Sequence, residues 1–173
     1  MPRSKLALFV PLVAVLVVAD RVTKAIAEQV LVLYVPREVL GNTLRWTLVY
    51  NPGAAFGLHL GPYSRWIFMA LTVAALFILA NLYRDTKPGD HWRTTAVALV
   101  TAGALGNLVD RIISPRGVVD FIDVGIGAAR WPTFNVADMA VSVGAVLLAL
   151  VLWGEDRAAA RAAALGTGPS GAT

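Results

Sequence analysis

Five aspartates lie in or beside apolar stretches of this sequence and could carry acid–base chemistry: Asp20, Asp110, Asp120, Asp123 and Asp138. An ionised side chain at membrane depth costs about 2.5–3.5 kcal/mol, so such groups usually have a function. Asp20 is followed one helical turn later by Lys24, and Asp110 is followed directly by Arg111. Ion pairing therefore explains these two aspartates as well as chemistry does.

Asp120 and Asp138 differ from the others. Asp120 lies between pairs of apolar residues with no adjacent cation, and Asp138 lies about one turn into an expected helix that Thr133 or Asn135 can already cap. Two carboxylates in dry surroundings can share one proton, so that one deprotonates a water while the other polarises a carbonyl. These two residues are our candidate catalytic pair, whereas we expect Asp123 to face water.

Other chemistries find little support. The absence of cysteine excludes disulfides, thiolate metal sites and a cysteine nucleophile, and His59 and His91 are too far apart to suggest a metal site. A Ser–Lys pair would need Lys24 close to Ser64 or Ser114. The Lys and Arg residues are scattered in ones and twos, which argues against nucleic-acid binding.

The composition is that of a membrane protein. Hydrophobic residues make up 57% of the chain and charged residues only 15%, and the mean hydropathy is +0.66. Four apolar blocks of 14 to 18 residues are Leu6–Ala19, Trp66–Tyr83, Thr94–Val109 and Met139–Trp153. Each is somewhat shorter than the roughly 20 residues that span a bilayer, so the helices must extend into neighbouring polar residues. We predict an all-α integral membrane protein with four transmembrane helices.

Four spans place both termini on the same side of the membrane. Lys and Arg are denser around the termini and the Arg84–Arg93 loop, which favours termini in the cytoplasm. The first and third helices then run outward and end near Asp20 and Asp110, and the fourth starts its inward run near Asp138. The polar ends of three helices therefore meet at one membrane face. A cleaved signal peptide could also begin this way, but no Ala-x-Ala-like site precedes Asp20, so we expect a retained first helix.

The segments between the helices complete the predicted organisation. Val30–Asn51 is rich in β-branched and aromatic residues and predicts a short β-structure outside the membrane. Ser114–Trp131 is expected to lie along the interface. We predict one membrane-embedded domain over residues 1–153, followed by a cytoplasmic tail over residues 154–173 that is briefly helical and then disordered.

Asparagine and glycine gather at the same face as the aspartates. Asn51-Pro-Gly-Ala-Ala-Phe-Gly57 is a turn-rich stretch whose backbone can approach a ligand, and Gly103-Ala-Leu-Gly-Asn107 places small residues on the third helix. Close packing explains these glycines equally well. The amides of Asn51, Asn107 and Asn135 could orient the carboxylates or hold a substrate backbone.

Five segments in this order resemble the lipoprotein signal peptidases, the bacterial type II signal peptidases. They are Asp20-Arg-Val-Thr-Lys24, Asn51-Pro-Gly-Ala-Ala-Phe-Gly57, Gly103-Ala-Leu-Gly-Asn-Leu-Val-Asp-Arg111, Val118-Val-Asp-Phe-Ile122 and Phe134-Asn-Val-Ala-Asp138. The resemblance covers residues 5 to 153. Each motif is weak alone, but five in order are specific.

The resemblance implies an intramembrane aspartyl endopeptidase with Asp120 and Asp138 as catalytic residues. It implies supporting roles for polar and glycine positions at the same face, namely Asp20, Asn51, Gly53, Asn107, Asp110, Arg111 and Asn135. The implied substrate is a diacylglyceryl-modified prolipoprotein, cut just before its lipid-modified cysteine and held by the β-rich segment. We expect no metal or organic cofactor, membrane lipids as partners, a monomer, and a bacterial inner-membrane location with the site near the extracytoplasmic face.

Two alternatives stay open. A proton- or cation-coupled transporter would use the aspartates as a relay, but the acidic groups gather at one end of the bundle instead of lining a path through it. An inactive relative that binds lipoprotein precursors would keep the fold without cleavage.

Overall fold

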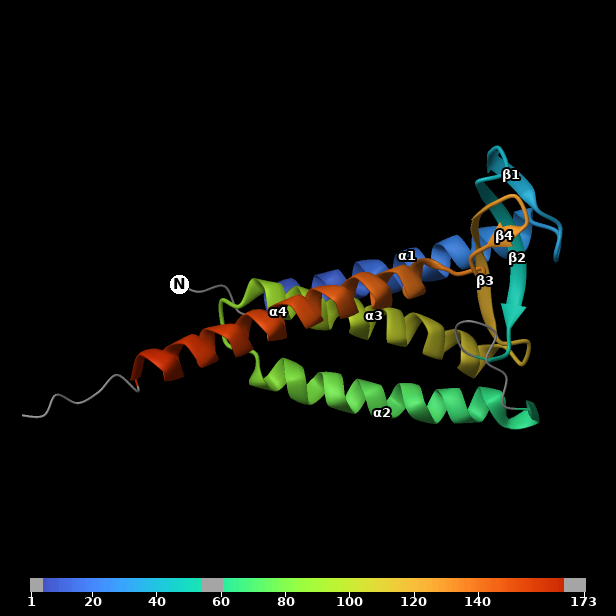
Figure 1. The fold of residues 1–173 in the computed structure, drawn as a ribbon. Coiled ribbons are helices and arrows are strands. Elements are labelled where there is room, and N and C mark those ends of the chain that lie inside the picture. Colours follow the sequence, from blue (N-terminus) through green and yellow to red (C-terminus); the bar gives the residue numbers. More distant parts are fainter. Residues whose placement is uncertain (1–4, 54–60, 167–173) are drawn as a thin grey trace, which may run out of the picture.

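The computed structural model of the chain describes residues 5–53 and 61–166. Its long helices are α1 (Leu6–Val30), α2 (Ser64–Asp85), α3 (His91–Ile113) and α4 (Val136–Gly166). They run side by side, with a small β-sheet at one end (Figure 1). Four helices in the described part are long and apolar enough to cross a membrane, which confirms the predicted spans.

The helices extend through polar residues, as the short apolar blocks predicted. α1 continues past Asp20 to Val30, α3 continues past Asp110 to Ile113, and α4 begins directly after Asn135. These ends meet beside the sheet, whereas α1 begins and α4 ends at the opposite end of the bundle (Figure 1). α4 runs to Gly166; the expected disorder beyond it concerns residues 167–173, which lie outside the described residues.

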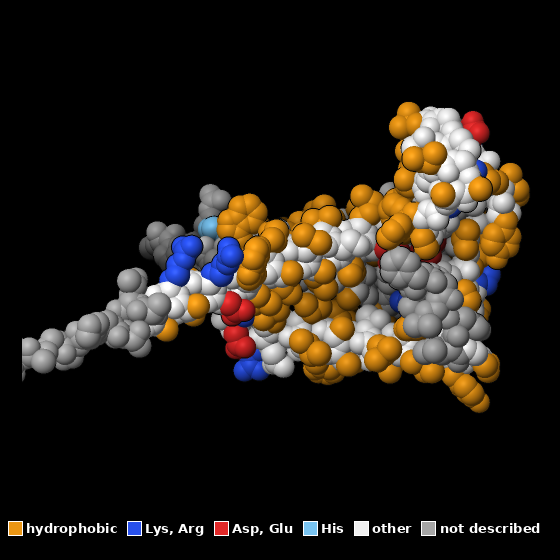
Figure 2. All heavy atoms as spheres, viewed as in Figure 1, with side chains coloured by type: hydrophobic (Ala, Val, Ile, Leu, Met, Phe, Trp, Pro, Cys, Tyr) orange, Lys and Arg blue, Asp and Glu red, His pale blue; other side chains and the backbone are white. Residues whose placement is uncertain are grey.

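α3 is the central helix and packs against α1, α2 and α4. Half of its most apolar window is buried, compared with 6–17% for the other three spans. The other helices therefore turn most of their apolar side chains outward, where lipid would cover them, and these side chains line the flank of the bundle in Figure 2.

Glycines let α3 and α4 approach closely. A Cβ atom built on Gly103 would lie 2.6 Å from Val141 Cγ2, and one built on Gly144 would lie 2.8 Å from Leu99 Cβ. Neither position has room for a methyl group, so backbone contact between these helices depends on small residues.

A half-buried cation closes the end of α2. The Lys5 ammonium donates to the carbonyl oxygens of Tyr83, Arg84 and Thr86, at 2.6, 3.0 and 2.7 Å. These carbonyls lie at or just beyond the last turn of the helix, where backbone acceptors lack intrahelical partners. The contact ties the start of α1 to the turn that leads into α3.

The sheet is antiparallel with the order β1 (Arg37–Leu40), β2 (Leu44–Asn51), β3 (Val118–Ile126) and β4 (Ala129–Arg130). β1 and β2 confirm the β-structure predicted within Val30–Asn51. β3 was not predicted, because most of its first half is buried and its sequence lacks the alternation of a half-exposed strand. β3 pairs with β2 with Val49 opposite Asp120, which holds the first candidate aspartate over the bundle.

Candidate active site

A cavity of about 480 Å³ lies where the sheet meets the ends of α3 and α4. Asp120 reaches it from β3 and Asp138 from the first turn of α4. Asn107 and Arg111 line it from α3, and Asn51 lines it from the end of β2. The fold thus brings together five residues that the sequence analysis singled out from four separate elements.

Asp120 is 3% exposed and held by two amides. Its Oδ1 accepts a hydrogen bond from Asn135 Nδ2 at 2.7 Å, and its Oδ2 accepts one from Asn51 Nδ2 at 3.1 Å. Burial, followed by the nearby Asp138 carboxylate, raises the pKa of Asp120 to about 7, although both amide hydrogen bonds favour the ionised form. Asp120 can therefore gain or lose a proton near neutral pH, as acid–base catalysis requires.

Asp138 is built into the start of α4. Asn135 Oδ1 accepts the Asp138 backbone N–H at 2.9 Å, and Asp138 Oδ2 accepts the Asn135 backbone N–H at 3.1 Å. This reciprocal arrangement is a capping box. It confirms Asn135 as the cap, and it adds a capping role for Asp138 that the sequence analysis missed. The remaining oxygen, Asp138 Oδ1, accepts from Asn107 Nδ2 at 2.8 Å.

Asn51 is itself oriented by its surroundings. Its Oδ1 accepts the Gly53 N–H at 3.0 Å, which leaves Nδ2 to face Asp120. Arg111 Nη2 donates to the Gly53 carbonyl oxygen at 3.0 Å and so holds the same turn against α3. Residues 54–57 of the predicted turn-rich stretch lie outside the described residues.

Gly117 allows the backbone of Asn51 to approach. It has a φ of +104°, in the region that favours glycine, and a Cβ atom there would lie 2.6 Å from the Asn51 carbonyl carbon. A larger residue would push Asn51 away from Asp120.

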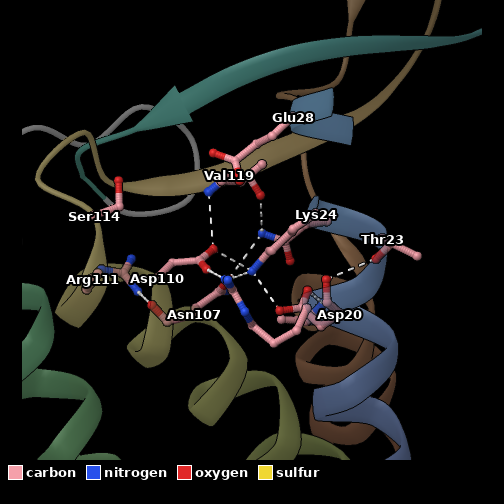
Figure 3. A network of polar contacts seen from close by, with 12 residues as sticks. Asp20, Thr23, Lys24, Glu28, Asn107, Asp110, Arg111, Ser114 and Val119 are labelled. Atoms are coloured by element: carbon pink, nitrogen blue, oxygen red, sulfur yellow. Dashed lines mark hydrogen bonds and ion pairs between the residues drawn. The ribbon is translucent and has the colours of Figure 1, made fainter. Parts of the chain in front are cut away.

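Asp20 and Asp110 do not line the cavity but lie beside it in a buried ionic cluster (Figure 3). Lys24 Nζ lies 2.7 Å from Asp20 Oδ2 and 2.8 Å from Asp110 Oδ2. Asp20 Oδ1 accepts the backbone N–H of Ala137, the residue before Asp138, at 2.9 Å. Both carboxylates therefore contact the cavity-lining residues only through other groups.

Asp110 has different partners from those that its neighbour in sequence suggests. It pairs with Lys24 and Arg21, and its Oδ2 accepts the Val119 N–H at 3.2 Å. Arg111 points elsewhere, toward backbone carbonyl oxygens and the cavity. Ion pairing thus accounts for Asp110, but not with the residue that follows it.

The expectation that Asp123 faces water is wrong. Asp123 is 4% exposed, and it pairs with Arg45 and Arg130 and accepts a hydrogen bond from Thr47 Oγ1 at 2.9 Å. Burial alone would raise the pKa of Asp123, but hydrogen bonds from Arg130, Arg45 and Thr47 outweigh it and lower the pKa. This carboxylate joins β2, β3 and β4, which explains it without catalysis.

Other site types find no support in the described part of the chain. No group of three or more His, Asp or Glu residues there is arranged to hold a metal. Lys24 is occupied by carboxylates and by Asn107, and Ser64 Oγ donates to the Gly61 carbonyl oxygen, so neither belongs to a Ser–Lys pair.

Sequence reasoning missed part of the cavity. Val118 of β3, the loop after β4 and the next turns of α4 complete the lining; the loop and α4 contribute Trp131, Pro132, Thr133, Phe134, Met139, Val141, Ser142 and Val143. Met139 and Val143 are also exposed on the outside of α4. Only their helical spacing from Asp138 could have placed them near it.

Comparisons with known proteins agree with this architecture. The family model described as signal peptidase (SPase) II matches residues 12–154. A lipoprotein signal peptidase from Ectopseudomonas mendocina is 41% identical over 152 residues, covering 86% of this chain and 89% of the relative. One from Pseudomonas aeruginosa PAO1 is 42% identical over 137 residues, covering 77% and 80%. A bacterial membrane enzyme structure, solved by the in meso method at 2.3 Å, superposes with a TM-score of 0.79 at 30% identity, covering 87% and 90%.

Proposed function

The chain belongs to the signal peptidase II family, and we propose that it is an aspartyl endopeptidase that uses Asp120 and Asp138 to cut diacylglyceryl-modified prolipoproteins. The proposed cut lies just before the lipid-modified cysteine and releases the signal peptide. One observation carries the proposal: a buried carboxylate, Asp120, and a half-buried one, Asp138, face one cavity, and each of their four oxygens accepts one N–H hydrogen bond.

The arrangement supports a shared-proton mechanism. The ionised carboxylate takes a proton from a water molecule, whose oxygen attacks the scissile carbonyl carbon. The protonated carboxyl donates its proton to the carbonyl oxygen, which gives a neutral tetrahedral intermediate. When that intermediate collapses, the C–N bond breaks and the leaving nitrogen takes the proton from one carboxyl. As the C=O bond re-forms, a hydroxyl of the intermediate gives its proton to a carboxylate, so the pair again holds one proton.

The location of the cavity supports a lipid-modified substrate. The cavity extends from the sheet along α4 to Met139 and Val143, which also face the outside of the bundle. A peptide could lie against the sheet while its acyl chains stay in the bilayer. We infer a site at the extracytoplasmic face of the bacterial inner membrane, with the protein acting as a monomer and without a metal or organic cofactor.

The test is cleavage of a diacylated prolipoprotein by purified protein, read as a mobility shift on a gel. Asp120→Asn and Asp138→Asn should each reduce turnover by about 10³-fold or more, because each removes one proton-transfer group. Asp123→Asn is the matched control: a buried carboxylate three residues from Asp120 that does not line the cavity. Its folded fraction should keep the wild-type rate.

The unmodified precursor should be cut slowly or not at all. Wild-type rates in either dyad variant would overturn the aspartyl mechanism. A well-folded wild type that binds the diacylated precursor without cutting it would indicate an inactive relative.

A further inference from the structure

Lys24 is the most enclosed charged side chain beside the candidate site. It has no exposed surface, although it lies on a membrane-spanning helix. Its ammonium group contacts Asp20 Oδ2 at 2.7 Å, Asp110 Oδ2 at 2.8 Å and Asn107 Oδ1 at 3.0 Å. An ammonium has three donors and no acceptor, and here it makes two ion pairs and one hydrogen bond (Figure 3).

Contact with a donor-only group decides which way the Asn107 amide points. Asn107 Oδ1 must face Lys24, so Nδ2 faces Asp138 Oδ1 at 2.8 Å. Asn107 Oδ1 also accepts from Asn135 Nδ2 at 3.1 Å, and the same Nδ2 donates to Asp120 Oδ1 at 2.7 Å. Lys24 and Asn135 therefore both donate to Asn107 Oδ1, while the N–H groups of the two amides donate to Asp138 and Asp120.

We propose that Lys24 is a positioning residue for the aspartate pair: its ammonium fixes the orientation of the Asn107 amide, which then directs an N–H group at Asp138 and an oxygen at the Asn135 amide that donates to Asp120. This inference rests on the proposed peptidase function. Without the ammonium, Asn107 Oδ1 keeps Asn135 Nδ2 as a donor but loses its charged one, so the amide is less firmly held and can rotate by half a turn to present an oxygen to Asp138. The carboxylate would then meet an acceptor in place of a donor and shift within the cavity.

The ammonium also contributes charge. The ionisable groups around the pair are Asp20 and Lys24 on α1, Asp110 and Arg111 on α3, Asp138 on α4 and Asp120 on β3. The positive charge of Lys24 opposes the rise in the pKa of Asp120 that burial causes. Removing this charge makes ionisation of the pair harder, so both limbs of the pH–rate profile should move to higher pH.

Arg21 provides a matched control on the same helix. It also pairs with Asp110, but it does not contact Asn107 in the described structure. A purely structural role of the cations around Asp110 would make Arg21 and Lys24 equivalent, whereas the amide relay involves Lys24 alone.

The experiment compares full-length wild type, Lys24→Met and Arg21→Met in the prolipoprotein cleavage assay across a pH series. Lys24→Met should lower kcat by about 100-fold with little change in KM, because it misplaces the pair without touching the substrate. Both limbs of its profile should move upward by about one pH unit. The position of the limbs does not depend on how much protein is folded. Arg21→Met should keep the wild-type profile.

Chemical rescue distinguishes a positioning role of the Lys24 ammonium from a role in folding stability. The chain contains no cysteine, so Lys24→Cys can be alkylated at one site with 2-bromoethylamine, which rebuilds an ammonium of nearly the same reach. Alkylation is done in denaturing detergent, followed by refolding, with wild type carried through the same steps. Rescue of kcat and of the profile supports the proposal.

Three results would overturn it: a wild-type profile for Lys24→Met, an equal loss in Arg21→Met, or a refolded alkylated protein that stays inactive while refolded wild type is active. Failure of the peptidase function itself looks different, because untreated wild type would then not cleave the substrate at all.

Discussion

At the scale of single residues, the candidate site is defined by the direction of its hydrogen bonds. Asp120 and Asp138 accept from Asn51, Asn107 and Asn135, and each amide oxygen accepts from another donor. A carboxylate surrounded by N–H groups favours its charge, whereas burial and a second carboxylate oppose it. The balance of these opposed effects raises the pKa of Asp120 to about 7.

This balance predicts how Asp120→Asn changes stability with pH. The folded-state pKa of Asp120 is about 7, above its ordinary value of 3.8. Between these values the folded chain holds a proton that the unfolded chain has released, so wild type loses stability as pH rises toward 7. Asparagine cannot ionise, so the variant should gain several degrees of apparent melting temperature over wild type at about pH 8.5 and little at about pH 4.5.

Thermal unfolding in detergent measures this difference, and Asp123→Asn is the opposite control. The pKa of Asp123 is lowered by its partners, so its ionised form stabilises the fold at neutral pH and that contribution is lost as pH falls. Asp123→Asn should therefore be less stable than wild type at neutral pH. An unchanging offset for Asp120→Asn across the range would contradict the raised pKa.

The sequence predicted the candidate catalytic aspartates, but not the ion-pair partners of the other buried aspartates. Asp120 and Asp138 could be chosen because an acidic residue among apolar ones, with no adjacent cation, needs an explanation. The partners of Asp110 and Asp123 could not be foreseen, because Arg21, Arg45 and Arg130 reach them only through tertiary packing. Residues adjacent in the sequence are possible ion-pair partners, but strand register and helix packing determine which pairs form.

At the scale of elements, the site depends on the separation between α3 and α4. Asn107 lies on one helix and Asp138 on the other, and their 2.8 Å hydrogen bond requires close backbones. Gly103 provides this closeness one turn away from Asn107. Gly103 therefore serves both the packing of α3 against α4 and the hydrogen bond between Asn107 and Asp138.

Gly103→Ala should therefore reduce both stability and turnover. Its added methyl group would meet Val141 Cγ2 at 2.6 Å, and the resulting strain should cost about 1–3 kcal/mol. Gly154→Ala is the matched control on α4, since a Cβ there meets nothing within 4 Å. It should be neutral or slightly stabilising, because alanine favours helix. Thermal unfolding and cleavage rates check both variants; equal behaviour would contradict the packing role.

The helices were predicted well because their length depends on the local sequence. The apolar lengths implied that α1, α3 and α4 continue into polar residues, and they do. β3 was missed because a strand buried on most of its length shows no alternation, and only its pairing with β2 reveals it. The cavity depends on that pairing, so its shape could not be inferred from the sequence.

At the scale of the whole molecule, the candidate catalytic groups lie together at one end of an apolar bundle. The aspartate pair, the ionic cluster and the sheet lie together, whereas the flanks expose apolar side chains (Figures 1 and 2). Such a distribution suits a site at a membrane face and not a path across the membrane, which argues against a transporter.

The orientation can be tested with single cysteines, since the chain has none. Glu38 in β1 lies at the sheet end and Lys87 in the turn between α2 and α3 lies at the other; both are exposed. In intact bacterial spheroplasts, a membrane-impermeant maleimide should label Glu38→Cys at once. Lys87→Cys should react only after permeabilisation. The reverse pattern would place the termini outside and contradict the orientation inferred from the basic residues.

The capping box at the start of α4 gives Asp138 a structural role that Asp120 lacks. Asp138 both faces the cavity and closes the first turn of a transmembrane helix, so selection for folding alone would retain it. Asp120 caps no helix, and its burial makes the ionised form costly to keep. In a descendant that gave up cleavage, position 120 should drift first while position 138 persists. Under the proposed mechanism, the presence of Asp120 is therefore the better marker of whether a relative still cleaves its substrate.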